Sequence, residues 1–150
     1  MAGSSIAPRL GLPYLGDGVG LRDPHFGHLM ATPPEAWGVD WFEIVSENYI
    51  GHDGYAAHVL ERVRAHRPIV MHGVSLSIGS SDPLDRQYLD DLAALAERIK
   101  PAWISDHLCW TGVLGLNSHD LLPVPLNEPA FANNVPPDQM PVMALIVAVA

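Results

Sequence analysis

The sequence predicts an α/β fold built on a parallel sheet. Strand-like runs begin near residues 39, 69 and 102 of the 150-residue chain. Their separation of about thirty residues is the size of one βα unit. Between them, apolar residues recur every three or four positions, as on the buried face of a helix. Strands that alternate with helices in this way are typical of parallel α/β folds.

The first elements are predicted from glycine, proline and β-branched residues. The glycine-rich run 15–21 predicts a short strand. Asp23 and Pro24 then fit the N-cap and first position of a short helix. Residues 39–45 (VDWFEIV) predict the second strand, because β-branched and aromatic side chains predominate there.

The next βα unit follows the same pattern. Residues 55–63 place their apolar side chains on one helical face, and Pro68 ends the helix. The uninterrupted apolar run 69–71 is typical of a strand covered on both faces.

The third helix is predicted to start with Asp82 as its N-cap and Pro83 at its first position. An apolar stripe then runs to Ile99, and Pro101 stops the helix. Residues 102–105 begin a fourth strand. A complete (β/α)₈ barrel needs about 250 residues and at least roughly 200. We therefore expect at most four βα units, which cannot close a barrel alone.

The composition excludes several classes of protein. The chain has 17 Asp and Glu against 8 Lys and Arg, a formal net charge of −9. Binding to nucleic acid or to an anionic membrane surface needs clustered cations, so neither is expected. The single cysteine, Cys109, cannot form an intramolecular disulfide, which favours a reducing, cytoplasmic compartment. The N-terminus shows no signal-peptide pattern.

The C-terminal segment differs from the rest, so we divide the chain into a partial domain (1–134) and an atypical tail (135–150). Residues 140–150 carry no charge and are too few to span a bilayer, which takes about twenty. Two interpretations stay open. The tail is a buried strand or helix, or it is an abnormal end produced by truncation or a frame change.

Polar side chains follow each well-defined strand, at the edge where parallel α/β folds bind ligands. His72 and His107 end neighbouring predicted strands, which suggests a metal or acid–base site. A structural role is the alternative for each histidine. Asp106 points to the opposite pleat face from His107, so it could be a buried support. The histidines predicted to be solvated are His25, His28, His52, His58 and His66.

Other catalytic signatures are missing from the sequence. It contains no phosphate-binding glycine loop, no dinucleotide fingerprint, no paired zinc cysteines and no serine nucleophile elbow. Nothing near Cys109 is cationic enough to activate its thiol. Residues 117–123 are expected to form a polar loop, in which His119 is either scaffolding or a substrate contact.

Four stretches closely resemble the multinuclear non-haem iron-dependent oxidative enzymes, long known only as a domain of unknown function. The stretches are Trp41–Ile50, Met71–Leu89, Pro101–Val113 and His119–Leu126, within a collinear similarity over about residues 12–132. The resemblance implies a TIM-type (β/α)₈ barrel that holds two or three iron ions at the carboxyl ends of its strands. It also implies oxidation of side chains, commonly cysteine, in ribosomally made peptides with dioxygen. A small partner protein that recognises the precursor peptide is implied too.

The resemblance assigns roles residue by residue. His72 and His107 match two iron ligands from the N-terminal half of the family barrel, and such ligation suits non-haem iron. Asp106 resembles a residue that orients a ligand from outside the metal's coordination shell. Glu47 and Asn48 match residues at the edge of the site. His119 and Asp120 match a motif position to which we assign no role.

The sequence departs from the family beyond residue 131, where the remaining ligands should begin. No glutamate follows Glu128. The leading interpretation is an N-terminal half of a TIM-type barrel, not closed and inactive alone. A second interpretation, from a different functional class, is a non-catalytic half-barrel. It would assemble with itself through open sheet edges, or with a separate C-terminal chain. A metal-independent fragment of a sugar-isomerase-like barrel is a third interpretation.

Overall fold

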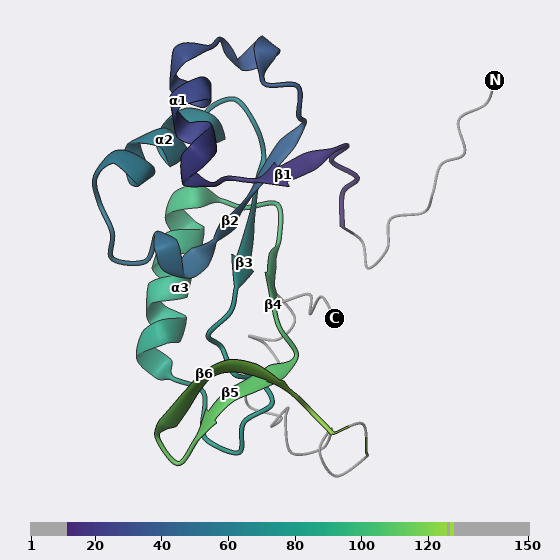
Figure 1. The fold of residues 1–150 in the computed structure, drawn as a ribbon, viewed down its shortest axis with the longest axis vertical. Helices are drawn as coiled ribbons and strands as arrows, with labels where there is room; N and C mark the ends of the chain where they lie inside the picture. Colours follow the sequence, from purple (N-terminus) through teal and green to yellow (C-terminus); the bar gives the residue numbers. More distant parts are fainter. Residues whose placement is uncertain (1–11, 126, 128–150) are drawn as a thin grey trace, which may run out of the picture.

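The computed structural model describes residues 12–125 and 127, and a four-stranded parallel sheet forms its centre (Figure 1). Strand order follows the chain, β1–β2–β3–β4, and every neighbouring pair is parallel. A separate antiparallel pair, β5 and β6, follows the sheet. In chain order the elements are β1 (Gly18–Gly20), α1 (Asp23–Ala31), the 3-10 helix η2 (Pro34–Ala36), β2 (Trp41–Val45), the 3-10 helix η3 (Ser46–Asn48), α2 (Tyr55–Arg64), β3 (Ile69–Gly73), α3 (Arg86–Ile99), β4 (Ile104–Asp106), β5 (Cys109–Val113) and β6 (Leu116–Pro123).

One face of the parallel sheet packs against α1, α2 and α3, which lie on the same side of it (Figure 1). Register places Ile44 beside Met71, and Met71 beside Ile104. All three are buried in one apolar cluster with side chains from the three helices. The predicted strands are therefore adjacent and parallel, which confirms the α/β prediction.

Residues that alternate with this core point to the other face of the sheet, which carries no described helix. Glu43 and Val70 are paired across β2 and β3, and His72 and Ser105 across β3 and β4. At the amino end of this face the rings of Trp41 and Trp103 lie 5.9 Å apart. A barrel likewise carries helices outside and side chains within, so the fold is compatible with a partial TIM-type fold. The sheet is not closed over the described residues.

Helix α1 begins one residue earlier than the sequence predicts, and helix α3 begins three residues later. α1 starts at Asp23 with Arg22 as its N-cap. α3 starts at Arg86, and its N-cap is Asp85, whose carboxylate accepts the backbone N–H of Gln87 at 2.9 Å. Asp82, the predicted cap, instead accepts the backbone N–H of Gly115 at 3.1 Å. The predicted start of this helix is wrong because a tertiary contact uses the capping carboxylate.

Residues 117–123, expected to be a polar loop, instead belong to β6, which forms a hairpin with β5. Leu114 and Gly115 make the turn, with φ of 54° and 72°. Two successive positive φ angles are typical of the type I′ turn that suits the twist of a hairpin. The predicted tail, residues 135–150, lies outside the described residues. Among those that are described, no helix is long and apolar enough to cross a bilayer.

Candidate metal centre

His72 and His107 meet at the carboxyl end of β3 and β4. Their Nε2 atoms lie 3.0 Å apart and their ring centroids 4.7 Å apart. The other ring nitrogen of His72, Nδ1, lies 2.9 Å from Ser105 Oγ. The Ser105 hydroxyl donates to the Met71 carbonyl at 3.4 Å, so its oxygen can accept the Nδ1–H of His72. This tautomer leaves Nε2 of His72 unprotonated and directed at His107.

Partial burial favours the uncharged form of His72. Desolvation lowers the pKa of this imidazole, and the charge of Glu43 opposes the shift without cancelling it. A neutral imidazole is the form that binds a metal ion. The environment of His72 therefore suits a metal ligand.

The spacing of the two rings can be tested against metal coordination. Imidazole nitrogens bind first-row metals such as zinc at about 2.0–2.1 Å, so two neighbouring ligands at right angles are about 2.9 Å apart. The observed 3.0 Å contact is a hydrogen bond between the two rings, and its length also matches two ligands of one ion. Within the described residues no group of three or more His, Cys, Asp or Glu is placed to hold a metal. The metal role of His72 and His107 stays a prediction.

Glu47 anchors the chain that leaves β3. Its Oε1 accepts the backbone N–H groups of Val74 at 2.8 Å and Ser75 at 2.9 Å, and the hydroxyl of Tyr88 at 2.7 Å. Its Oε2 is buried and has no hydrogen-bond partner in the described structure. One carboxylate oxygen thus ties η3, the segment after His72 and the first turn of α3 together.

Asp106 lies on the helix side of β4, paired with Gly73, on the opposite face from His107. It is 1% exposed. Its Oδ1 accepts the backbone N–H of His107 at 2.7 Å, while the buried Oδ2 has no partner among the described residues. Burial first, and then the charge of Glu47, raise the pKa of Asp106 to about 7. Asp106 thus contacts the backbone of His107, a candidate metal ligand.

Position 73 leaves no room for a side chain, because Asp106 and the Tyr88 hydroxyl lie close to its backbone. A Cβ atom built on it would overlap Asp106 Oδ2 and lie 3.0 Å from the Tyr88 hydroxyl. We expect Gly73→Ala to lower the free energy of unfolding by about 1–3 kcal/mol, because the core must shift to admit a methyl group. Urea unfolding measures this. The matched control is Gly27→Ala, where a Cβ meets nothing within 4 Å and helix α1 should gain about 0.5–1 kcal/mol. Equal changes in the free energy of unfolding for the two variants would contradict the crowding at Gly73.

Tyr88 contributes to the stability of the fold through its hydroxyl group, which donates a hydrogen bond to Glu47. Burial and the hydrogen bond to Glu47 raise the pKa of this phenol, so it remains a donor at neutral pH. We expect Tyr88→Phe to destabilise the fold by about 1–2 kcal/mol, because Glu47 loses one of its donors. The measurement is urea unfolding beside Tyr55→Phe, a control whose side chain is 59% exposed. A loss no larger than that of the control would show that the bond contributes nothing.

The remaining candidates lie in different surroundings. Asn48 is exposed in η3. Asp120 is exposed on β6, and its carboxylate accepts the backbone N–H of Leu121 at 2.9 Å. His119 belongs to β6, but its side chain lies outside the described residues. Cys109 is 5% exposed, and burial raises the pKa of its thiol. The histidines predicted to be solvated, His25, His28, His52, His58 and His66, are all exposed.

Sequence reasoning missed the roles of Ser105 and Tyr88. Tyr88 lies on the apolar stripe that the sequence predicts to run to Ile99, and that stripe indicates only a buried ring. A hydroxyl in the first turn of that helix is the signal that could have placed it at the ligand edge of the sheet. For Ser105 the signal is period-two alternation, which puts residues 105 and 107 on one face.

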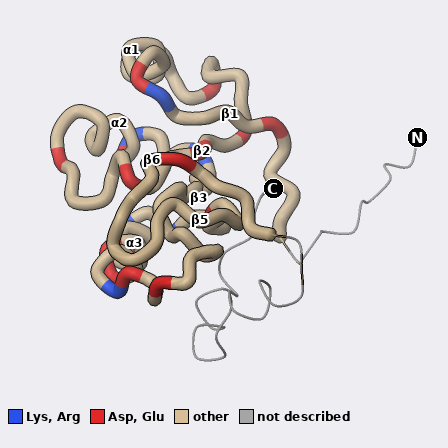
Figure 2. Tube along the Cα trace, turned by 60° about the horizontal axis from the view of Figure 1, so that its bottom comes forward, with Lys and Arg blue, Asp and Glu red and all other residues tan. Residues whose placement is uncertain are grey.

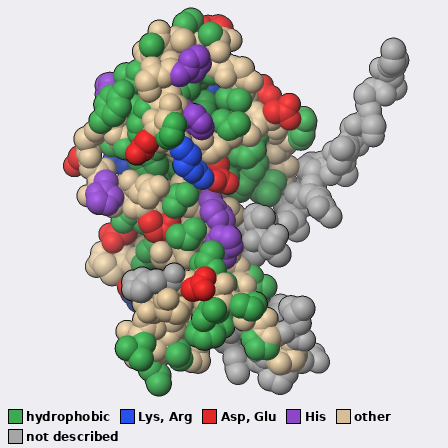
Figure 3. All heavy atoms as spheres, in the orientation of Figure 1, with side chains coloured by type: hydrophobic (Ala, Val, Ile, Leu, Met, Phe, Trp, Pro, Cys, Tyr) green, Lys and Arg blue, Asp and Glu red, His purple; other side chains and the backbone are tan. Residues whose placement is uncertain are grey.

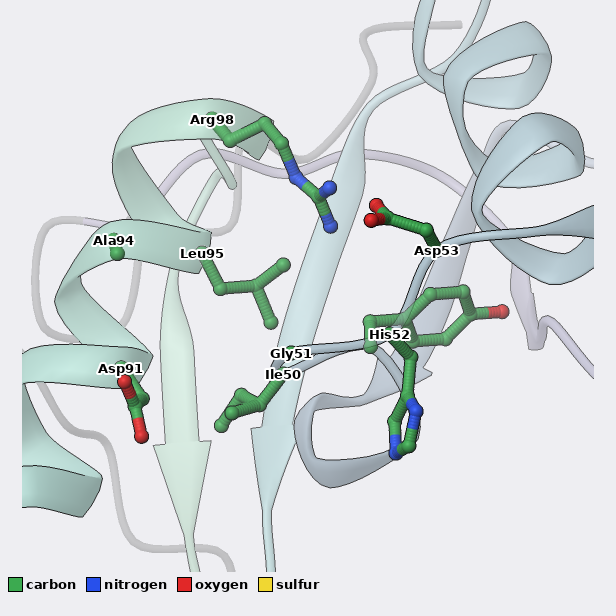
Figure 4. A pocket seen from close by; sticks show the side chains of 9 residues that line it. Ile50, Gly51, His52, Asp53, Asp91, Ala94, Leu95 and Arg98 are labelled. Carbon is green, nitrogen blue, oxygen red and sulfur yellow. The ribbon is translucent and has the colours of Figure 1, made fainter.

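A hollow lies apart from these histidines, between the loop after η3 and helix α3 (Figure 4). It has a volume of about 360 Å³, and its lining includes His52, Asp53, Asp91 and Arg98. None of the candidate site residues lines it. We assign it no part in the site.

A family comparison decides the affiliation of the chain. The family described as "RiPP precursor modification enzyme MbnB/TglH/ChrH" matches residues 16–136, which include both histidines and the hairpin. The chain belongs to this family. RiPPs are ribosomally synthesised and post-translationally modified peptides, so the family's substrates are precursor peptides.

Curated relatives share the same region. A "UPF0276 protein" of Caulobacter vibrioides is 49% identical over 120 residues, covering 80% of this chain and 42% of the relative. Another from an Anaeromyxobacter species is 53% identical over 122 residues, 81% of this chain and 42% of the relative. One from Acaryochloris marina is 46% identical over 113 residues. The chain thus spans about two-fifths of the length of these relatives.

The charge distribution of the chain does not favour binding to a polyanion. Along the described trace, acidic positions are spread over loops and helices, and Lys and Arg form no cluster (Figure 2). Nucleic-acid binding needs such a cluster. The prediction that the chain does not bind nucleic acid rests on this distribution and on the net charge of −9.

Proposed function

We propose that this chain supplies the N-terminal half of a TIM-type barrel in a multinuclear non-haem iron enzyme. The enzyme would use dioxygen to oxidise side chains, commonly cysteine, of a ribosomally made precursor peptide in the cytoplasm. A small partner protein would recognise that peptide. The observation that carries this proposal is the 3.0 Å approach of the Nε2 atoms of His72 and His107, in a chain of a peptide-modifying family.

The residues of the chain have separable tasks in this proposal. His72 and His107 would hold iron, and bound iron would supply the redox chemistry with dioxygen. Ser105 orients His72 by accepting its Nδ1–H. Glu47 holds the backbone that follows His72. Asp106 accepts the backbone N–H of His107 and so supports the second ligand.

The number of ligands argues that this chain does not catalyse oxidation by itself. Two imidazoles cannot complete the coordination of two irons, each of which takes several ligands. A second candidate is therefore a half-barrel that assembles with itself or with a separate chain. The helix-free face of the sheet favours it, as do the outer edges of β1 and β4, which pair with no strand among the described residues. Sedimentation of the purified chain distinguishes a monomer from such an assembly.

A chimera tests the iron proposal directly. Residues 16–125 of this chain would replace the aligned segment of the Caulobacter vibrioides relative, which is 49% identical. We expect the chimera, purified without oxygen, to contain iron by mass spectrometry, and the same chimera with His72→Ala to lose it. Mass spectrometry of a co-expressed precursor peptide reports modification. An iron-free chimera that folds like the parent would overturn the proposal.

A further inference from the structure

Arg22 brings a positive charge to the helix-free side of the parallel sheet, where His72 and His107 meet. It lies two residues after β1, and its guanidinium reaches the side chain of Glu43 in β2. The other Lys and Arg residues of the described chain lie on α2 and α3 or shortly after them: Arg62, Arg64, Arg67, Arg86, Arg98 and Lys100. Those helices cover the opposite face (Figure 1). Among the described residues, Arg22 is thus the cation on the face of the candidate metal centre.

Three hydrogen bonds hold the guanidinium of Arg22 in one position. Nη1 donates to the carbonyl oxygens of Leu21 at 3.1 Å and Glu43 at 3.3 Å, and Nη2 donates to Glu43 Oε1 at 3.1 Å. Gly20 leaves room for the group, because a Cβ atom there would lie 2.8 Å from Cζ and 2.9 Å from each Nη atom. A side chain that is already ordered loses little conformational entropy when it binds a ligand.

Arg22 keeps hydrogen-bond donors for a further acceptor. A guanidinium carries five N–H donors, and the three hydrogen bonds leave two of them for another group. The side chain of Arg22 is 42% exposed and that of Glu43 33%, so a ligand can reach both. The planar donors of arginine match the two oxygens of a carboxylate. A carboxylate is therefore the chemical group that complements this position.

The pair of Arg22 and Glu43 lies close to the candidate metal centre. Glu43 is the register partner of Val70, which precedes His72 by two residues and shares its face of the sheet. Burial lowers the pKa of the His72 imidazole, and the charge of Glu43 raises this pKa whereas the charge of Arg22 lowers it. Figure 3 shows basic, acidic and histidine side chains next to one another on the face drawn there. A ligand bound to Arg22 thus lies on the same face as His72 and near it.

We propose that Arg22 binds a carboxylate of the substrate peptide, and so selects peptides with an acidic side chain or a free C-terminus near the residue that is modified. The inference rests on the proposed function, which supplies the peptide as the ligand. Ligands of parallel α/β barrels bind at this end of the strands. Because the chain has a net charge of −9, a positioned cation gives a carboxylate one favourable place to bind. Glu43 positions the guanidinium in this arrangement.

Three acetylated pentapeptides of serine and glycine test this inference. One has a central glutamate and an amidated C-terminus, the second a central glutamine and a free C-terminus, and the third a central glutamine and an amidated C-terminus. Each is titrated into the isotope-labelled chain, freed of metal on a chelating resin, and NMR follows the Nε–H signals of the arginines. We expect one or both carboxylate peptides to shift the Arg22 signal and to bind about 2–5-fold more tightly than the neutral peptide. The peptide that does so identifies the source of the carboxylate.

Two variants separate the charge of Arg22 from its position. Arg22→Gln should remove the preference for a carboxylate, whereas Arg98→Gln, at an exposed position of α3, should retain it. Gly20→Ala keeps the charge but displaces the guanidinium, because the crowded atoms are the end of a flexible side chain. It should reduce the preference with an unchanged circular dichroism spectrum.

Equal binding of the three peptides to the wild type overturns the inference, and so does a preference that survives Arg22→Gln. If Arg22→Gln does not fold, an unreduced preference in Gly20→Ala overturns it instead.

The same chain separates this inference from the proposed function. His72→Ala should lose cobalt(II) binding, measured by absorption spectroscopy, and still prefer a carboxylate peptide. A carboxylate preference without any cobalt binding by the wild type would overturn the metal proposal and support the role of Arg22. Cobalt binding without a carboxylate preference would do the reverse.

Discussion

Replacing His72 with alanine is expected to reduce the affinity of the chain for a first-row divalent metal by at least about 100-fold. Loss of a residue that only orients a ligand costs about 10–100-fold, and loss of one of two paired ligands should cost more. His107→Ala should reduce the metal affinity by a similar factor, because the two Nε2 atoms face each other at 3.0 Å. Anaerobic titration with iron(II), or cobalt(II) as a spectroscopic probe, measures the change.

Graded controls make this result specific. Ser105→Ala removes the acceptor of the His72 Nδ1–H and should cost about tenfold. His58→Ala removes an exposed histidine of α2 and should change nothing. Equal affinities for the wild type and His72→Ala would contradict a metal role for this pair.

The second large effect concerns Asp106 and pH. Its folded-state pKa of about 7 lies above the ordinary aspartate value of 3.8, so between these values the folded chain holds a proton that the unfolded chain has lost. The free energy of unfolding therefore falls as pH rises from about 4 to 7, by up to about 4 kcal/mol from this group. Asp106→Asn abolishes the effect, because the amide does not ionise. The variant should match the wild type near pH 4 and be more stable by about 2–4 kcal/mol at pH 8.

Urea unfolding in EDTA at pH 4.5, 6 and 8 measures this difference. His72 and the other titratable groups are present in both proteins, so their contributions cancel in the comparison. Asp90→Asn, an exposed acid in the same chain, should follow the wild type at every pH. If the curves of Asp106→Asn and wild type run parallel, the carboxyl group is ionised in the fold at low pH and this account of its burial is wrong.

Much of the fold was predictable, because its parallel strands are buried and each lies in one short apolar run of the sequence. β2, β3 and β4 lie within the apolar runs near 39, 69 and 102, since a strand in a parallel sheet must be apolar where helices cover it. The same alternation predicted Asp106 and His107 on opposite faces. Asp106 pairs with Gly73 in β4, and His107, just beyond the strand, contacts His72 on the other face. The placement of His72 and His107 at one edge followed from parallel pairing alone. Their metal role stays a prediction.

The errors come from contacts between distant segments. Asp82 had the local signature of an N-cap, but its carboxylate binds Gly115, 33 residues away in the sequence. The hairpin was not predicted, because its turn is Leu114–Gly115 rather than the Asn-Gly or Asp-Gly typical of type I′. Both errors concern the turn of the hairpin, which Asp82 contacts at Gly115.

By itself, the sequence determined the order of the parallel strands and of the helices between them, the edge at which the polar residues collect and the family of the chain. Those properties depend on local periodicity and on motifs within single segments. Only the tertiary structure decided that Glu47, Tyr88 and Asp106 gather around Gly73, and that β6 faces the chain after His72. Such contacts join residues tens of positions apart, and they follow from how α3 and the hairpin pack against the sheet rather than from any pattern within one element.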